Sequence, residues 1–87
     1  MVRVILPRVL QGLFPGCPLE LELEAANLAE VMDQLNARWP GMRDRLCDST
    51  PRIRRHINVF VDGEKANLTT VIPQGGEVVV LTAISGG

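Results

Sequence analysis

One stretch of helical spacing lies among segments that have the pattern of β-strands. Its apolar residues recur three or four positions apart: Leu28, Val31, Met32, Leu35 and Trp39. Asn27 is a suitable N-cap and Pro40-Gly41 ends the pattern, so we expect one amphipathic helix over residues 27–39. A further short turn of helix is expected over Met42–Cys47. We interpret Trp39 as a core or rim residue rather than a ligand platform.

The N-terminal segments predict a hairpin. Val2–Leu6 is rich in β-branched residues, with Val2, Val4 and Leu6 inward, and Pro7 stops it. Gln11–Pro18 contains two glycines and two prolines, which is typical of a turn. Leu19–Glu24 then alternates strictly, so its three glutamates share one face. We interpret that face as solvated, with a docking surface as the alternative.

Two further strands are expected in the C-terminal half. Ile57–Val61 alternates and is followed by Asp62-Gly63, a strong two-residue hairpin signal, with a short partner strand around 65–67. Pro73–Gly76 is a turn. Glu77–Leu81 is almost continuously apolar, which is typical of a central strand.

This order of elements defines the fold class. A chain of 87 residues forms one domain. The order of its strands and helix is incompatible with repeating βαβ units. The single main helix can cover only one face of the sheet. We therefore expect an α+β domain of the β-grasp (ubiquitin-like) type, with a mixed sheet of four to five strands. The domain spans residues 1–81, and residues 82–87 form a flexible C-terminal tail.

Composition excludes several classes of function. A domain this small leaves little volume for an enclosed active site, so we expect no enzyme. The net charge of −1 disfavours nucleic-acid binding, and the basic cluster Arg52, Arg54 and Arg55 is interpreted as a solvated loop or strand edge, with a binding stripe as the alternative. Because no apolar run approaches the ~20 residues of a membrane span and no signal peptide is seen, we expect a cytoplasmic protein without membrane partners.

Few side chains offer chemistry of their own. Cys17 and Cys47 have neither disulfide nor metal-ligand spacing, so we expect reduced thiols and no metal site. Cys17 is interpreted as a partly exposed structural thiol, with sulfur acceptance or adduct formation as the alternative. His56 is the only histidine and is interpreted as an ordinary residue at the start of a strand rather than a catalytic one. No glycine-rich phosphate loop follows a strand.

The last residues of the chain are small and end in Gly86-Gly87. Glycine lacks a Cβ, so such a tail can thread a narrow channel and present a carboxylate to another protein's active site. The alternative is a frayed terminus without a role.

Together, these patterns resemble the MoaD/ThiS family of ubiquitin-like sulfur carriers over essentially the whole chain. The segments that carry the resemblance are Val2-Arg3-Val4-Ile5-Leu6, Val59-Phe60-Val61-Asp62-Gly63-Glu64, Pro73-Gln74-Gly75-Gly76-Glu77-Val78 and Ala83-Ile84-Ser85-Gly86-Gly87.

The resemblance implies a reaction cycle at the carboxylate of Gly87. A ubiquitin-activating-type enzyme uses ATP to form an acyl adenylate, and sulfide from a donor then displaces AMP to leave a thiocarboxylate. The carrier supplies no catalytic residue and binds no cofactor itself. Ile84, Ser85 and Gly86 would thread the partner's channel.

Strand alternation also predicts a docking surface. If Val78 and Val80 face the helix, four apolar residues lie on the side without a helix: Ile5, Phe60, Val79 and Leu81. Such a patch near the tail favours a binding surface over an aggregation hazard. Leu81 also matches the position at which members of the family contact the adenylating enzyme.

The destination of the sulfur has several alternatives. Val80–Ile84 lacks the aromatic and proline residues common in the small subunit of molybdopterin synthase, and the chain is longer than typical thiazole-synthesis carriers. It is more similar to a cysteine-biosynthesis carrier, whose partners are a pyridoxal-phosphate cysteine synthase that uses an activated serine and a metalloprotease. A molybdopterin synthase small subunit, carriers for secondary-metabolite or tRNA thiolation, a ubiquitin-like modifier joined through Gly87 to lysines, and an interaction domain with an inert tail remain alternatives.

Overall fold

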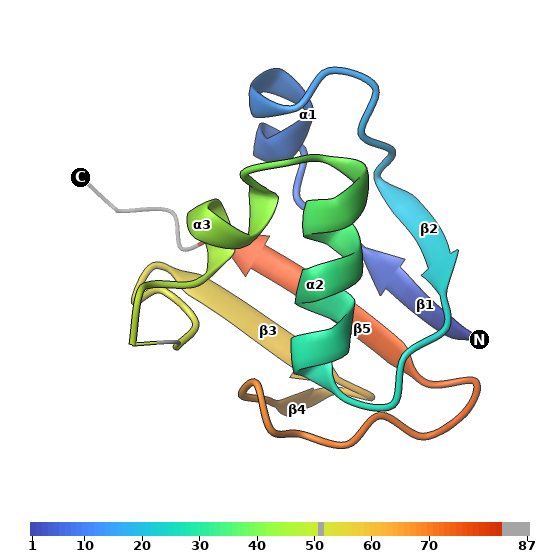
Figure 1. Ribbon diagram of the computed structural model, residues 1–87. Helices are drawn as coiled ribbons and strands as arrows, with labels where there is room; N and C mark the ends of the chain where they lie inside the picture. The colour runs from blue at the N-terminus through green and yellow to red at the C-terminus, as the bar shows by residue number, and fades with distance from the viewer. Residues whose placement is uncertain (51, 83–87) are drawn as a thin grey trace.

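A computed structural model describes residues 1–50 and 52–82, so Ile84, Ser85, Gly86 and Gly87 lie outside the described residues. The elements are β1 (Val2–Ile5), α1 (Val9–Leu13), β2 (Glu20–Leu23), α2 (Leu28–Arg38), α3 (Met42–Leu46), β3 (Ile57–Val61), β4 (Glu64–Lys65) and β5 (Glu77–Thr82) (Figure 1). The sheet has the order β2-β1-β5-β3-β4. β1 and β5 are parallel and the other pairs are antiparallel. The predicted β-grasp fold is confirmed, with β5 at the centre.

The helix-covered face of the sheet forms the core. α2 crosses this face (Figure 1), and its buried residues are those of the predicted apolar stripe: Leu28, Val31, Met32 and Leu35. Trp39 is half-buried and packs against the core, as expected. From the sheet, Val4, Val78 and Val80 are fully buried against the helix. Burying apolar side chains of this size contributes about 1.5–3 kcal/mol each, so this face stabilises the fold.

The start of α2 follows from its local sequence. The Asn27 side chain accepts a hydrogen bond from the backbone N–H of Glu30 at 2.9 Å, and the Glu30 carboxylate accepts one from the Ala26 N–H at 2.8 Å. The first bond satisfies a backbone donor that the first turn of a helix cannot pair internally, and the second ties the residue before the N-cap to that turn. The predicted helix boundaries are therefore confirmed to within a residue.

α1 corrects the prediction of a turn over Gln11–Pro18, because residues 11–13 belong to this short helix. Leu10 is buried in the core and anchors the helix. A five-residue helix shows too little periodicity to be recognised in the sequence, and Gly12 argues against helix on propensity alone. Tertiary packing of Leu10 outweighs that propensity.

The hairpin between β3 and β4 has the predicted two-residue turn. Asp62 and Gly63 have φ of 50° and 85°, and Val61 pairs with Glu64. Positive φ at both central residues is the geometry that the Asp-Gly pair favours. Because the turn closes at Gly63, β4 begins at Glu64, one residue before the predicted partner strand.

At the other end of the sheet, β5 extends to Thr82, which pairs with Ile57. Thr82, which we expected to be the first residue of the tail, therefore belongs to the sheet. Within residues 1–50 and 52–82, no helix combines the length and the apolar character that crossing a membrane requires.

Candidate functional site

The face of the sheet away from α2 carries an apolar row in its centre. Val79 of β5 pairs with Ile5 of β1 on one side and with Phe60 of β3 on the other. All three side chains are half-buried, whereas their sequence neighbours Val4 and Val80 are fully buried against the helix. The predicted alternation is therefore correct, and the three residues lie next to one another.

Leu81 continues this surface toward the end of β5. It lies two positions after Val79 on the same face, is 48% exposed, and pairs with Asn58 across the sheet. We call Ile5, Phe60, Val79 and Leu81 the open-face set. Leu81 is its most exposed member and lies one residue before the end of β5, so a protein that binds Leu81 would be close to the point where the chain leaves the sheet.

Charged residues flank the apolar row at both edges of the sheet. Glu20 of β2 pairs with Ile5, and Lys65 of β4 pairs with Phe60. The row thus runs from an acidic edge across three apolar side chains to a basic edge. A partner with the opposite polarity would be oriented by these charges.

A small ion-pair network is built on the acidic edge. Arg3 donates two hydrogen bonds to the Glu20 carboxylate, from Nε at 2.8 Å and from Nη2 at 3.0 Å. Glu77 is more distant, with its Oε2 at 3.9 Å from Arg3 Nη1. The hydrogen bond from Arg3 lowers the pKa of the Glu20 carboxyl. Both side chains are about half exposed, so this network contributes little to the stability of the fold. Its charges are available to orient a binding partner.

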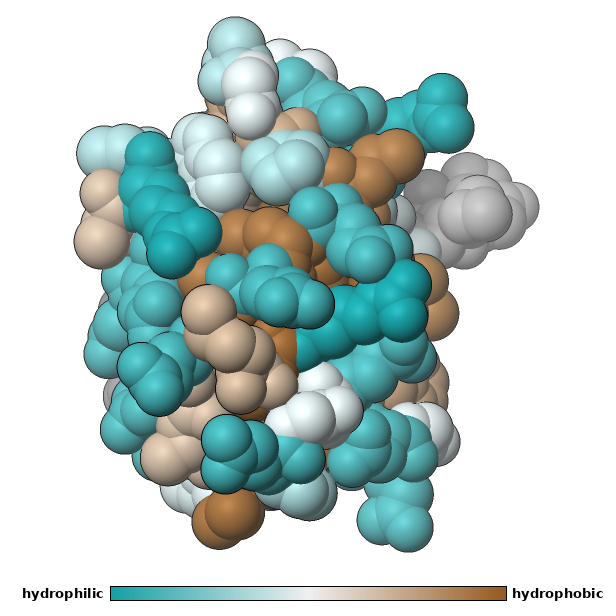
Figure 2. Space-filling view, turned by 90° about the vertical axis from the view of Figure 1, so that its right-hand side faces the viewer, coloured by the Kyte–Doolittle hydropathy of each residue, from teal (hydrophilic) through white to brown (hydrophobic). Residues whose placement is uncertain are grey.

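The glutamate face of β2 has the predicted exposure. Glu20, Glu22 and Glu24 are all exposed. The side of the molecule seen in Figure 2 is largely hydrophilic, with a hydrophobic patch near its centre between polar side chains. One of the three glutamates, Glu20, is an ion-pair partner rather than a fully solvated residue, which the alternation alone did not indicate.

The two thiols lie in the core. Cys17 and Cys47 are free and buried, and burial raises the pKa of both. Cys17 was expected to be partly exposed, but the turn after α1 brings it into the core, where it is 2% exposed. His56 is exposed immediately before β3. Within the described ranges, no cluster of potential metal ligands occurs.

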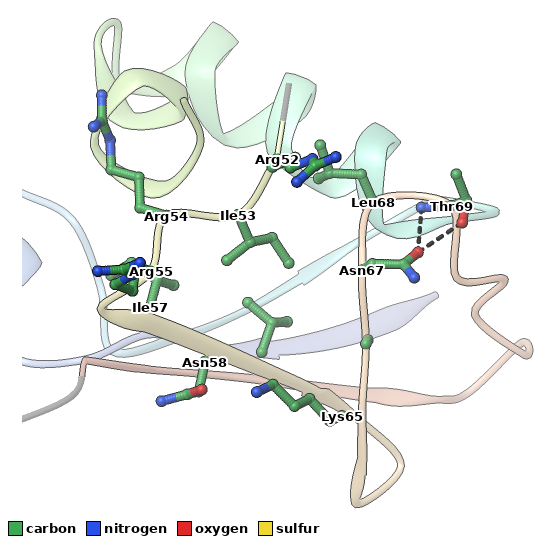
Figure 3. A pocket seen from close by; sticks show the side chains of 12 residues that line it. Arg52, Ile53, Arg54, Arg55, Ile57, Asn58, Lys65, Asn67, Leu68 and Thr69 are labelled. Carbon is green, nitrogen blue, oxygen red and sulfur yellow. Dashed lines mark hydrogen bonds between the residues drawn. The ribbon is translucent and has the colours of Figure 1, made fainter. Parts of the chain in front are cut away.

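The structure places the basic cluster beside a hollow that the sequence did not indicate. Arg52, Arg54 and Arg55 line a concavity of about 500 Å³ together with residues of the segment 65–69 (Figure 3). The two segments are distant in sequence, so no local pattern could have brought them together. Lys65 also belongs to this lining.

Comparisons with known proteins agree with this architecture. The profile of the ThiS family matches residues 13–87. Sulfur carrier protein CysO of Mycobacterium tuberculosis is 30% identical, over 99% of this chain and 98% of the relative.

Solved structures show the same likeness. The Amycolatopsis orientalis BexX/CysO complex contains a chain with a TM-score of 0.88 and 27% identity, covering 100% of both chains. SAMP1 of Haloferax volcanii, with a TM-score of 0.76 and 23% identity over 99% and 98% of the two chains, shares the fold. The family profile covers most of the described domain, and the sequence relative covers nearly all of the chain. This chain therefore belongs to the ThiS family.

Proposed function

We propose that this protein is a sulfur carrier whose C-terminal Gly87 is converted to a thiocarboxylate. The observation that carries the proposal is the similarity, over nearly the full length of both chains, to a protein named as the sulfur carrier CysO. The Gly86-Gly87 pair supports it, because two residues without Cβ enter a narrow channel with little steric hindrance.

The proposed cycle takes place in partner enzymes. A carboxylate is a poor electrophile, so an oxygen of Gly87 first attacks the α-phosphorus of ATP and pyrophosphate leaves. Sulfide, released from a donor, then attacks the carbonyl carbon and AMP leaves, which gives the thiocarboxylate. This chain contributes the reacting carboxyl group and its positioning, while the partner supplies the catalytic residues.

We further propose that the open-face set binds the adenylating enzyme. Its support is the exposure of Leu81 and its place next to the end of β5. An apolar centre with charged edges is typical of a specific interface, since the centre provides affinity and the edges fix the orientation.

The proposed acceptor is an activated serine derivative, held by a pyridoxal-phosphate synthase, with a metalloprotease later freeing cysteine. The support is the sequence Val80–Ile84, which lacks the aromatic and proline residues common in molybdopterin synthase small subunits. The five residues 83–87 that follow β5 would reach roughly 17 Å when extended, enough to reach a buried electrophile while the globule remains outside.

The carrier proposal is tested by changing the C-terminus. We incubate the chain with an adenylating enzyme of this class, ATP and a sulfide source, and measure its intact mass. The wild-type chain should gain the mass difference between sulfur and oxygen. Deleting Gly87, or adding one residue after it, should abolish the gain while leaving the unfolding temperature unchanged.

Sulfuration of an extended variant that had not first been trimmed would contradict the role of Gly87.

The acceptor is tested with the thiocarboxylated protein. In the synthase, the thiocarboxylate sulfur should displace the activating group from the β-carbon of the serine derivative, which leaves a cysteine on Gly87, visible as a further mass gain. Sulfuration of a molybdopterin precursor instead would overturn the choice of acceptor only. Isopeptide-linked ladders on other proteins would favour a modifier.

A further inference from the structure

A hollow of about 500 Å³ lies along the outer edge of β3, between the segments 52–55 and 65–69 (Figure 3). In the described part of the chain, β4 pairs with β3 only at Phe60 and Val61. The first half of β3 therefore has no neighbouring strand on this side. The hollow occupies the place where the sheet is one strand short.

The first wall of the hollow is fixed by the loop after α3. Asp48 Oδ1 accepts hydrogen bonds from the backbone N–H groups of Thr50 and Arg52, both at 2.9 Å. The Arg54 N–H donates to the C=O of Leu46 at 2.9 Å. These bonds hold the segment that carries the arginines against the end of α3.

The second wall is fixed in the same way. Asn67 Oδ1 accepts hydrogen bonds from the Thr69 N–H at 2.9 Å and from its hydroxyl at 2.6 Å (Figure 3). The Ala66 N–H donates to the C=O of Val59 at 2.8 Å, which ties this wall to β3. Because both walls are held by hydrogen bonds, little conformational entropy would be lost in ordering the site when a ligand binds.

The lining combines an apolar floor with a cationic rim. Ile53, Val59 and Leu68 contribute apolar side chains to the lining. Arg52 lies beside Leu68 at one end, and Arg55 lies beside Ile57 at the other (Figure 3). Lys65 lies below β3 in the same view.

The rim cations are available for a ligand. Arg54 points toward α3 and donates from Nε to the C=O of Asp44 at 2.7 Å, so it is engaged (Figure 3). Among residues 1–50 and 52–82, no ion pair joins Arg52, Arg55 or Lys65 to a carboxylate. The protein has a net charge of −1, so this is a local positive surface on a nearly neutral molecule.

The arrangement of the lining selects among anionic ligands. Arg52 and Arg55 lie at opposite ends rather than converging, which disfavours a single phosphate (Figure 3). None of the described residues that line the hollow is aromatic, so these residues offer nucleic-acid bases no stacking surface. A peptide with spaced carboxylates and one apolar side chain fits both the rim and the floor.

We propose that this hollow binds an extended acidic peptide segment of a partner protein. One apolar side chain enters between Ile53 and Leu68, and flanking carboxylates pair with Arg52 and Arg55 at its two ends. Ile57 of the lining pairs with Thr82 in the sheet, so the bound segment lies near the end of β5. The site is distinct from the open-face set and does not depend on the sulfur-carrier proposal.

The test uses a fluorescein-labelled peptide with a central leucine flanked by two acidic residues on each side. We titrate it with the full chain, follow fluorescence anisotropy, and map the contact by changes in amide NMR shifts. The shifts should change in residues 52–55 and 65–69. Replacing the acidic residues by lysine should abolish binding, and replacing the central leucine by glycine should weaken it.

Matched variants locate the charge contacts. Arg52→Glu and Arg55→Glu should each weaken peptide binding by about tenfold, since a reversed charge repels the carboxylate that it paired with. Arg38→Glu makes the same charge change on the exposed end of α2 and should leave binding unchanged. Unfolding curves check that all three variants fold.

Three results would overturn the proposal. One is equal weakening by Arg52→Glu and Arg38→Glu, which would indicate a non-specific charge effect. Another is a set of shift changes outside the hollow. The last is displacement of the peptide by inorganic phosphate or by an oligothymidylate that binds more tightly, which would identify an anion or nucleic-acid site.

Discussion

The two faces of the sheet use the same residue types for different purposes. Val80 and Val79 are neighbours on β5, yet Val80 is fully buried against the helix layer and Val79 is half-buried on the other face. The difference arises from the element that covers each face, since the strand, its register and the side chain are the same. An apolar residue in this sheet therefore stabilises the fold on one face and remains available for binding on the other.

The apolar row of the open face is partly protected by its own members. Ile5, Val79 and Phe60 occupy adjacent strands, so each shields the flank of the next. Leu81 pairs with the polar Asn58 and remains 48% exposed. The open face is thus most available near the end of β5.

The largest expected effect comes from the valine pair on β5. Val80→Ala removes buried methyl groups from the core and should lower the free energy of unfolding by about 2 kcal/mol. Val79→Ala should cost less than about 1 kcal/mol, because part of the side chain is already in water. Urea unfolding of both variants measures the difference. Equal losses would mean that the open face is as important for stability as the core.

A smaller effect is expected for Leu81→Glu, measured as binding to the adenylating enzyme. A charge at an interface anchor should weaken binding by about 1 kcal/mol or more, with a smaller effect on stability. Val71→Glu is the matched control, because Val71 is also apolar and is 74% exposed outside the sheet. If the control weakened binding as much, or if Leu81→Glu lowered stability equally, Leu81 would not be a docking residue.

The smallest effect concerns the acidic edge of the open face. The pKa of Glu20 is lowered by Arg3, so its contribution to stability is present above the ordinary glutamate pKa and is lost as the pH falls through the lowered value. Glu20→Gln should therefore reduce the loss of stability on acidification. Urea midpoints of both proteins, near neutral pH and in acid, test this. An unchanged pH dependence would show that the ion pair is energetically silent.

The sequence predicted the regular elements because their signals are local. Asn27 and the apolar spacing of α2 define that helix without reference to the rest of the chain. Asp62-Gly63 likewise defines its turn, since few other residue pairs accept positive φ at both positions. Strand alternation placed all four members of the open-face set on one side, and the structure agrees.

The errors arose where a long-range contact decides the outcome. α1 forms because Leu10 is buried in the core, although Gly12 disfavours helix. Cys17 was expected to be partly exposed, but the same N-terminal segment carries it into the core. In both cases a contact with residues distant in sequence outweighs the local preference.

The sequence by itself determined the strands, the main helix, the inward and outward faces, and the family, because each depends on a repeating period or on short motifs. The tertiary structure decided which side chains share a surface. Sheet register placed Glu20 and Lys65 at opposite ends of one apolar row. Folding also placed Arg52, Lys65 and Leu68 around the same hollow. Such juxtapositions depend on the pairing of distant segments, and local patterns carry no information about that pairing.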